Sequence, residues 1–224
     1  MLTHKQITVA EELRASCPDF KGAAVYAEFV NNPHSAQLWQ EIEASLQHCR
    51  ESLTTESLKQ LPSILATRNA YRRLGKDPSR YRPSGEALIR RTLQGKPLYQ
   101  INTVVDLINL ASIEYGYSIG GFDYDKIEGD ALTLGVGQQD EPYEGIGRGM
   151  LNIEGLPVYR DSIGGIGTPT SDNERTALSL DSCRLLALVN GYDGNTLSVM
   201  ACANRIAELL AKYAECNFCD IVSY

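Results

Sequence analysis

The sequence predicts one mixed α/β or α+β domain of 224 residues, in which helices come first and strands cluster later. Three observations lead to this class. Apolar residues at helical spacing dominate the first half of the chain. Glycine-punctuated stretches of β-type sequence then run from about 118 to 190. A last helical pattern extends from Thr196 to Tyr213. Because helices and strands do not alternate regularly, the pattern does not favour repeated βαβ units.

Residues 1–75 are expected to form a mostly helical extension with one early strand, packed on the core. The strand covers 23–30, where β-branched and aromatic residues follow one another without a helix breaker. Ser35 is the expected N-cap of a helix that continues to about residue 52. Pro62 suits the first turn of a further helix, which ends near Gly75.

Residues 76–224 are expected to form the core domain, in one compact unit with the extension. Pro83 and Ser84 begin a helix, on whose exposed side we place Glu86 and Arg90 as an i, i+4 pair worth about 0.3 kcal/mol. A largely buried helix follows over 101–115. The strand-like segments after it are 117–122, 130–136, 150–153, 156–160, 185–190 and 216–224.

Composition excludes several classes of protein. With 43% hydrophobic and 22% charged residues, the chain is typical of a globular protein. It contains no apolar run of 18 residues and no apolar leader, so we expect no membrane segment and a cytoplasmic location. The six cysteines are irregularly spaced and are expected to be reduced thiols. Cys216 and Cys219 form one C-x-x-C pair, without the further ligands that a structural zinc needs.

Charge is unevenly distributed along the chain. The net charge is −7, yet residues 68–96 carry nine basic and two acidic side chains. Such a patch is either a phosphate contact or a solvated helical surface. The overall negative charge makes general DNA binding an unfavourable interpretation. If RNA is the partner, the expected contacts are Arg72, Arg73, Arg80, Arg82, Arg90 and Arg91.

Polar side chains on the apolar helix at 101–115 are the first candidates for chemistry. Asn102, Asp106 and Asn109 fall on one stripe of this helix. They either tie down neighbouring loops or border a ligand pocket. A second candidate is the acidic segment 122–130, in which Asp123 could act as an acid or base, or simply stabilise a turn.

Glycine-rich segments give the remaining signals. None has the strand, G-x-G-x-x-G and helix order of a dinucleotide site, and none continues into a phosphate-binding loop. In the last segment, Ser171 and Thr176 could form an anion nest or cap a loop. All three histidines lie within the first 48 residues, which argues against a Ser-His or Cys-His nucleophile in the core domain.

The run from Ile101 to Asp130 resembles the signature of the editing module, the B-three/B-four domain, of the phenylalanyl-tRNA synthetase beta subunit. The matching residues are Ile101, Asn102, Val104, Val105, Asp106, Asn109, Gly116, Phe122, Asp123, Asp125, Lys126, Ile127, Glu128 and Gly129. Weaker similarity extends from about Arg82 to the C-terminus. The resemblance implies a free-standing relative of the editing module, too short to be a complete synthetase.

In that family the module hydrolyses tyrosine wrongly attached to the phenylalanine tRNA, so the resemblance implies an aminoacyl-binding pocket. The residues expected to bind substrate are Asn102, Asp106, Asn109, Gly120, Gly164, Gly165 and Thr176, and the catalytic candidates are Asn109 and Asp123. Two departures stand out: Gly120 replaces a family histidine, and Ala187 or a neighbour replaces a family glutamate.

Three functions therefore stay open. The protein hydrolyses misacylated tRNA in trans, it is a tRNA- or amino-acid-binding module without the chemistry, or it acts on a small amino-acid-like ligand. The expected partner is an aminoacyl group or an aminoacyl-tRNA, with no cofactor, no metal, no DNA and no membrane.

Overall fold

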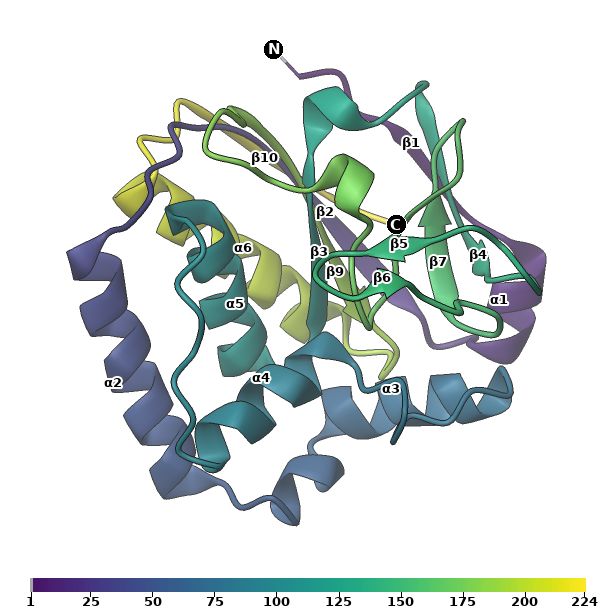
Figure 1. The fold of residues 1–224 in the computed structure, drawn as a ribbon, viewed down its shortest axis with the longest axis horizontal. Coiled ribbons are helices and arrows are strands. Elements are labelled where there is room, and N and C mark those ends of the chain that lie inside the picture. Colours follow the sequence, from purple (N-terminus) through teal and green to yellow (C-terminus); the bar gives the residue numbers. More distant parts are fainter. Residues whose placement is uncertain (1) are drawn as a thin grey trace.

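The computed structural model describes residues 2–224, and over this range it combines six α-helices with two four-stranded sheets and a short hairpin (Figure 1). The expected mixed α+β class is thus confirmed. None of the helices within this range has the length and apolar character that a bilayer span requires.

The first sheet has the strand order β10-β2-β9-β3 and is antiparallel throughout. Its strands are β10 (Phe218–Ser223), β2 (Lys21–Glu28), β9 (Arg184–Gly191) and β3 (Ser118–Asp123). The β2–β9 ladder runs from Lys21 opposite Gly191 to Glu28 opposite Arg184. Both strands are buried on both faces, which explains their nearly continuous apolar sequences.

The second sheet has the strand order β1-β4-β7-β8. Its strands are β1 (Gln6–Val9), β4 (Ala131–Val136), β7 (Pro157–Arg160) and β8 (Gly165–Gly167). This sheet packs on one face of the first sheet: Leu132 and Leu134 of β4 lie in the same core cluster as Tyr26 of β2 and Leu186 of β9. The intervening residues of β2 and β9 face a second cluster, to which the helices contribute.

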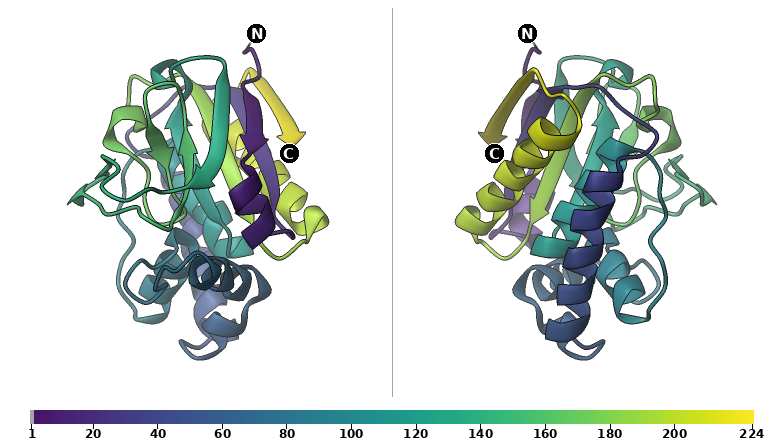
Figure 2. Two further views of the ribbon diagram at one scale, coloured as in Figure 1. Left: turned by 90° about the vertical axis from the view of Figure 1, so that its right-hand side faces the viewer. Right: turned by 90° about the vertical axis from the view of Figure 1, so that its left-hand side faces the viewer.

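Helices cover the other face of the first sheet, in the arrangement that Figures 1 and 2 show. The covering helices are α2 (Ala36–Ser52), α5 (Thr103–Tyr115) and α6 (Thr196–Tyr213), while α3 (Pro62–Arg73) and α4 (Ser84–Leu93) lie at one end and α1 (Glu11–Ser16) contacts β4. As predicted, Ser35 caps α2 by accepting a 3.3 Å hydrogen bond from the Leu38 N–H.

Two strands from residues 1–75 belong to the two main sheets. β1 pairs in parallel with β4, and β2 is hydrogen-bonded between β10 and β9. β1 and β2 thus lie in the same sheets as strands from residues 76–224. Neither β1 nor α1 was expected, and the strand predicted over 150–153 shrinks to β6 (Gly149–Met150), which pairs with β5 (Glu144–Gly145).

Candidate functional site

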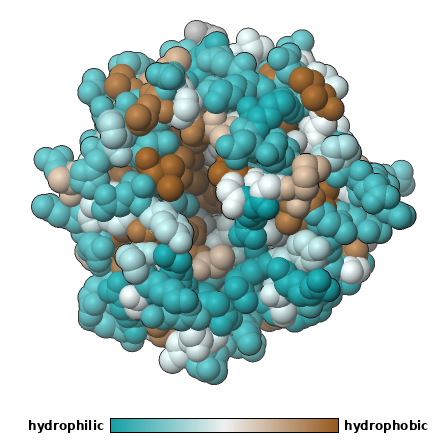
Figure 3. Space-filling model, in the orientation of Figure 1, coloured by the Kyte–Doolittle hydropathy of each residue, from teal (hydrophilic) through white to brown (hydrophobic). Residues whose placement is uncertain are grey.

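A small polar pocket opens where α4, α5, β3 and the loop after β8 meet. Its volume is about 130 Å³. The lining residues are Ser84, Leu88, Ile108, Asn109, Ser112, Ile119, Thr168, Ser171 and Asp172. The face drawn in Figure 3 is hollowed near its centre, between α5 and the β5–β6 hairpin. We call this site the Asn109–Asp172 pocket.

Asn109 brings an amide group to the pocket wall. It lies on α5 beside Ile108, and its side chain is partly exposed. Within residues 2–224, no hydrogen bond engages this amide, whereas the other two polar residues of the predicted stripe are bonded to protein groups. The Asn109 amide is therefore available to both donate and accept hydrogen bonds to a ligand.

Asp172 brings a carboxyl group to the same pocket. The Gly121 N–H donates a 3.0 Å hydrogen bond to its Oδ2. Among the described residues, its Oδ1 accepts no hydrogen bond. Burial raises the pKa of Asp172 from 3.8 to about 7, against the opposing effect of the Gly121 N–H. A carboxyl group with this pKa exchanges protons readily near neutral pH.

Gly120 supports this carboxyl by leaving space. A Cβ atom at Gly120 would lie 2.6 Å from Phe122 Cζ and 3.3 Å from Asp172 Oδ1. A Cβ atom at Gly167, on β8, would likewise lie close to Phe122 Cζ and Asp172 Oδ1. The two glycines thus allow the Phe122 ring and the Asp172 carboxyl to pack between β3 and β8. This is a structural reason for glycine at position 120.

Hydrogen bonds fix the loop that carries Asp172. Thr168 Oγ1 accepts from the Ser171 N–H and closes a tight turn. The Tyr143 hydroxyl donates to the Ser171 carbonyl at 2.7 Å, and the Ile146 N–H donates to the Asp172 carbonyl at 3.0 Å. Both contacts come from the segment around the β5–β6 hairpin. The carboxyl is therefore presented from a rigid support rather than from a flexible loop.

Asn102 and Asp106, the other residues of the predicted stripe, have structural partners. Asn102 is the N-cap of α5 and accepts a 3.0 Å hydrogen bond from the Val105 N–H. Asp106 accepts from Trp39 Nε1 at 2.8 Å and from the Ile101 N–H at 3.1 Å. Burial raises the pKa of Asp106. Of the stripe, only Asn109 lines the Asn109–Asp172 pocket.

Asp123 also lies outside this pocket. It accepts a 2.7 Å hydrogen bond from Ser182 Oγ and one of 3.1 Å from the Asp125 N–H. Lys126 Nζ is 3.4 Å from its Oδ2. These contacts match the turn-stabilising alternative for the acidic segment rather than the acid–base one.

The remaining expected substrate residues are spread over other positions. Gly164 belongs to a turn in which Asp161 Oδ1 accepts its N–H at 3.1 Å. Gly165, on β8, packs closely on the Tyr143 ring. Thr176 is fully buried, and its hydroxyl donates to the Ile166 carbonyl at 3.5 Å. The structure adds Asp172, which sequence reasoning passed over although it directly follows the glycine-rich segment and Ser171.

A buried carboxylate engages two of the predicted RNA-binding arginines. Glu86 is 0% exposed, and its oxygens lie 2.8 Å from Arg68 Nη1, 3.6 Å from Arg82 Nε and 3.3 Å from Arg90 Nη2. The expectation that Glu86 and Arg90 form an exposed pair is therefore wrong, because this side of α4 faces Arg68 of α3. Ser84, which lines the Asn109–Asp172 pocket, lies about 200° around the axis of α4 from Glu86, so Glu86 and the arginines gathered around it face away from the pocket.

The other predicted RNA-binding arginines are Arg72, Arg73, Arg80 and Arg91. The first three are exposed at and beyond the C-terminal end of α3. Arg91 donates to the Pro97 carbonyl at 2.6 Å and stacks over the Tyr99 ring. No residue in the described range forms an ion pair with these four guanidinium groups. They are the part of the basic segment best able to meet a phosphate.

The fold and this pocket define an α+β protein with a small polar site between a helix and a glycine-rich loop. The model of the B3/4 domain family matches residues 66–215, two thirds of the chain. The chain belongs to the B3/4 domain family. This match confirms the resemblance seen in the sequence.

Two further comparisons add context. The chain is similar to the crystal structure of an N-terminal fragment of the phenylalanyl-tRNA synthetase beta-subunit from Pyrococcus horikoshii, with 14% sequence identity and a TM-score of 0.49. The likeness covers 99% of this chain and 52% of that one, so the chain spans about half the length of the fragment. No curated protein matches the chain.

Proposed function

We propose that the Asn109–Asp172 pocket binds the aminoacyl group of an ester and hydrolyses that ester, with aminoacyl-tRNA as the substrate. The observation that carries the proposal is the Asp172 carboxyl, whose pKa of about 7 suits a general base, in the same pocket as the unengaged Asn109 amide. Membership of the B3/4 domain family supports the choice of an aminoacyl substrate.

In this mechanism Asp172 Oδ1 accepts a proton from a water molecule. The water oxygen forms a bond to the ester carbonyl carbon, and the bond from that carbon to the ribose oxygen breaks. The proton passes from Asp172 to the departing hydroxyl group. The Asn109 amide orients the aminoacyl group and donates a hydrogen bond to it. An ester is already activated, so positioning and one base supply much of the acceleration.

A deacylation assay tests the proposal. Tyrosyl-tRNA and other misacylated tRNAs are incubated with the protein, with Asp172→Asn and with Asn109→Ala. Asp181→Asn, which makes the same carboxyl-to-amide change at an exposed site, is the matched control. We expect Asp172→Asn to lower turnover by about 100-fold or more, as for loss of a general base, and Asp181→Asn to leave it unchanged. Equal turnover in Asp172→Asn would remove this carboxyl from the mechanism.

Turnover should also follow the ionisation of Asp172. Because the base form is the carboxylate, the wild-type rate should rise as the pH increases through about 7 and then level off. A protein without turnover that binds tRNA in a strongly salt-dependent way would be a binding module. That result would overturn the hydrolytic proposal.

A second class of substrate is a small ester without RNA. Arg68, Arg82 and Arg90 pair with Glu86, so their charges are less available to RNA phosphates, which favours this class. In this alternative the ester is a small amino-acid derivative without RNA. Comparing an aminoacyl methyl ester with the corresponding aminoacyl-tRNA separates the two. Comparable kcat/KM for both substrates would favour the small ester, whereas a strong preference for tRNA that Arg72→Gln and Arg80→Gln reduce would favour RNA.

A further inference from the structure

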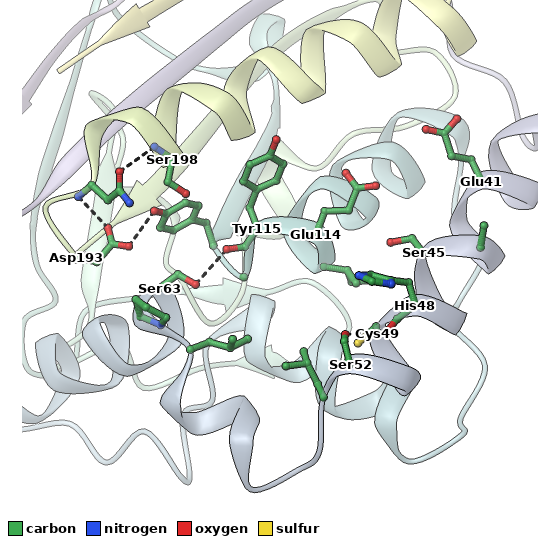
Figure 4. Close-up of a pocket in the computed structure, with 18 residues that line it drawn as sticks. Glu41, Ser45, His48, Cys49, Ser52, Ser63, Glu114, Tyr115, Asp193 and Ser198 are labelled. Atoms are coloured by element: carbon green, nitrogen blue, oxygen red, sulfur yellow. Dashed lines mark hydrogen bonds between the residues drawn. The ribbon is translucent and has the colours of Figure 1, made fainter.

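A second and larger cavity lies between the helices, with a volume of about 610 Å³ (Figure 4). It opens between α2, the start of α3, the end of α5 and the start of α6. It shares no lining residue with the Asn109–Asp172 pocket. Its walls from α2 and α3 precede residue 66, outside the stretch that matches the B3/4 domain family. The volume is that of a small-molecule site.

Asp193 provides a fixed carboxylate at one end of this cavity. Its Oδ2 accepts a 2.9 Å hydrogen bond from the Tyr117 hydroxyl, and its Oδ1 accepts one of 3.3 Å from the Asn195 N–H. Burial, with Asp193 adding to the effect, raises the pKa of Tyr117, which therefore stays a donor. Within residues 2–224, no cationic side chain pairs with Asp193. The carboxylate is thus positioned but its charge is not neutralised.

The other two carboxylates of the cavity differ from Asp193 in this respect. Arg205 forms ion pairs with Glu114, at 2.8 Å, and with Glu41. Lys212 Nζ is a further 2.7 Å from Glu41. The pKa of Glu41 is lowered to about 2, first by the hydrogen bond from Lys212. Arg205 and Lys212 therefore already compensate the charges of Glu41 and Glu114. The negative charge without a cationic partner in this cavity is that of Asp193.

Apolar side chains line the same cavity as the carboxylate. Leu53, Leu61 and Ile113 contribute to the walls, and Figure 4 places Tyr115 between Asp193 and Glu114. The C-terminal end of α5 also borders the cavity and adds partial negative charge from its last carbonyl groups. A positive group beside Asp193 would thus gain from both, while an apolar body would cover Leu61 and Ile113.

One feature of the cavity favours the opposite charge. The N-terminus of α3, at Pro62 and Ser63, borders the cavity and has no side-chain cap. A helix N-terminus attracts anions with a partial charge, about half an elementary charge. The full charge of Asp193 outweighs it at short range. At the N-terminus of α6, Asn195 already occupies the Ser198 N–H, and Asp193 itself accepts the Asn195 N–H, so this helix end is partly satisfied by the protein.

We propose that this cavity binds an organic cation: a primary or secondary amine joined by a short linker to an apolar or aromatic group. The ammonium group pairs with Asp193, and the apolar group lies against Leu61 and Ile113, with Tyr115 beside it. The site is independent of the hydrolytic proposal. It would give the segment before residue 66 a ligand-binding role.

Titration of the full chain with phenethylamine, followed by NMR or calorimetry, tests the proposal. The matched probes are 2-phenylethanol, which lacks the charge, 3-phenylpropionate, which reverses it, and phenylalanine, which carries both charges. We expect saturable binding that is tightest for phenethylamine. Asp193→Asn, which keeps a similar shape, should weaken phenethylamine binding at least tenfold, and Asp181→Asn should not change it.

A second variant, which blocks the cavity, keeps the test valid if Asp193→Asn fails to fold. Ser45→Phe fills the cavity from the partly exposed face of α2 and should abolish phenethylamine binding without loss of the circular dichroism spectrum. Tighter or equal binding of the alcohol, the carboxylate or phenylalanine would overturn the proposal. So would an absence of saturable binding, or unchanged binding in folded Asp193→Asn and Ser45→Phe.

Discussion

The N–H of Gly121 donates a 3.0 Å hydrogen bond to Oδ2 of Asp172, and this bond anchors the carboxyl of the glycine-rich loop to β3. The carboxyl accepts this bond from a neutral donor, and the residue is half-buried. Its pKa is therefore raised rather than lowered, although it accepts a hydrogen bond.

The raised pKa of Asp172 predicts a pH-dependent cost to stability. Between pH 3.8 and about 7 the folded state keeps the proton that the unfolded state has released, so the contribution of Asp172 falls as the pH rises. Above pH 7 the cost reaches on the order of 4 kcal/mol, since the pKa lies about three units above its ordinary value and each unit corresponds to about 1.4 kcal/mol. Asp172→Asn should thus gain stability over the wild type as the pH increases, measured by urea unfolding at pH 4, 5.5, 7 and 8. A pH-independent difference would contradict the raised pKa.

Glu86→Gln should be the most destabilising change on α4. The substitution leaves the guanidinium groups of Arg68, Arg82 and Arg90 without their shared carboxylate, and breaking a buried ion pair in this way costs about 3–5 kcal/mol. Arg82→Gln is the matched control, because the Arg82 side chain is 39% exposed and two arginines remain around Glu86. Urea unfolding should show a much smaller loss for Arg82→Gln; equal losses would mean that Glu86 does not act as the centre of the group.

The hydrogen bond between Trp39 and Asp106 should couple α2 to α5. Trp39→Phe removes the N–H that Asp106 accepts at 2.8 Å, and leaving a buried acceptor short of a partner costs about 1–3 kcal/mol. A double-mutant cycle with Asp106→Asn, followed by circular dichroism, measures the coupling between the two side chains. We expect at least about 0.5 kcal/mol, as for residues in direct contact; purely additive effects would argue against this bond.

Gly120→Ala should disturb the loop of the candidate site. The new methyl group would lie 2.6 Å from Phe122 Cζ, so the ring must shift, and overpacking of this kind costs about 1–3 kcal/mol. Gly164→Ala is the control, since its Cβ would meet nothing within 4 Å, and surface changes stay within about 0.5 kcal/mol. Thermal unfolding compares the two. Similar midpoints for both variants would show that the Phe122 ring moves aside freely.

Local signals made much of the fold predictable. Ser35, Pro62, Ser84 and Asn102 lie at or next to the starts of their helices, and Gly116 ends α5 in the left-handed conformation that glycine favours. Strands β2 and β9 were predictable because strands buried on both faces read as apolar runs. β1 was not, because its four residues are half-buried or exposed and become a strand through pairing with β4.

The candidate site was harder to predict than the fold. Asn109 came from its position on an apolar helix, which is a local pattern. Asp172 becomes a site residue through a hydrogen bond to Gly121, 51 positions away in the chain. The burial of Glu86 likewise depends on Arg68 of another helix, which a helical-wheel argument does not include. Spacing along the chain identifies residues that are neighbours on one helix or strand. The pKa shifts and ion pairs of the site depend on burial and contacts that other elements supply.

The central place of β2 in the first sheet constrains when the chain can fold. β2 is synthesised early, at Lys21–Glu28, but the strands on either side of it are Arg184–Gly191 and Phe218–Ser223. An emerging chain therefore carries an apolar strand without partners until nearly all 224 residues have been made. Contacts over such long sequence separations slow folding and leave the strand open to aggregation. Chaperone binding to nascent chains that end before residue 184 would be the cellular sign of this delay.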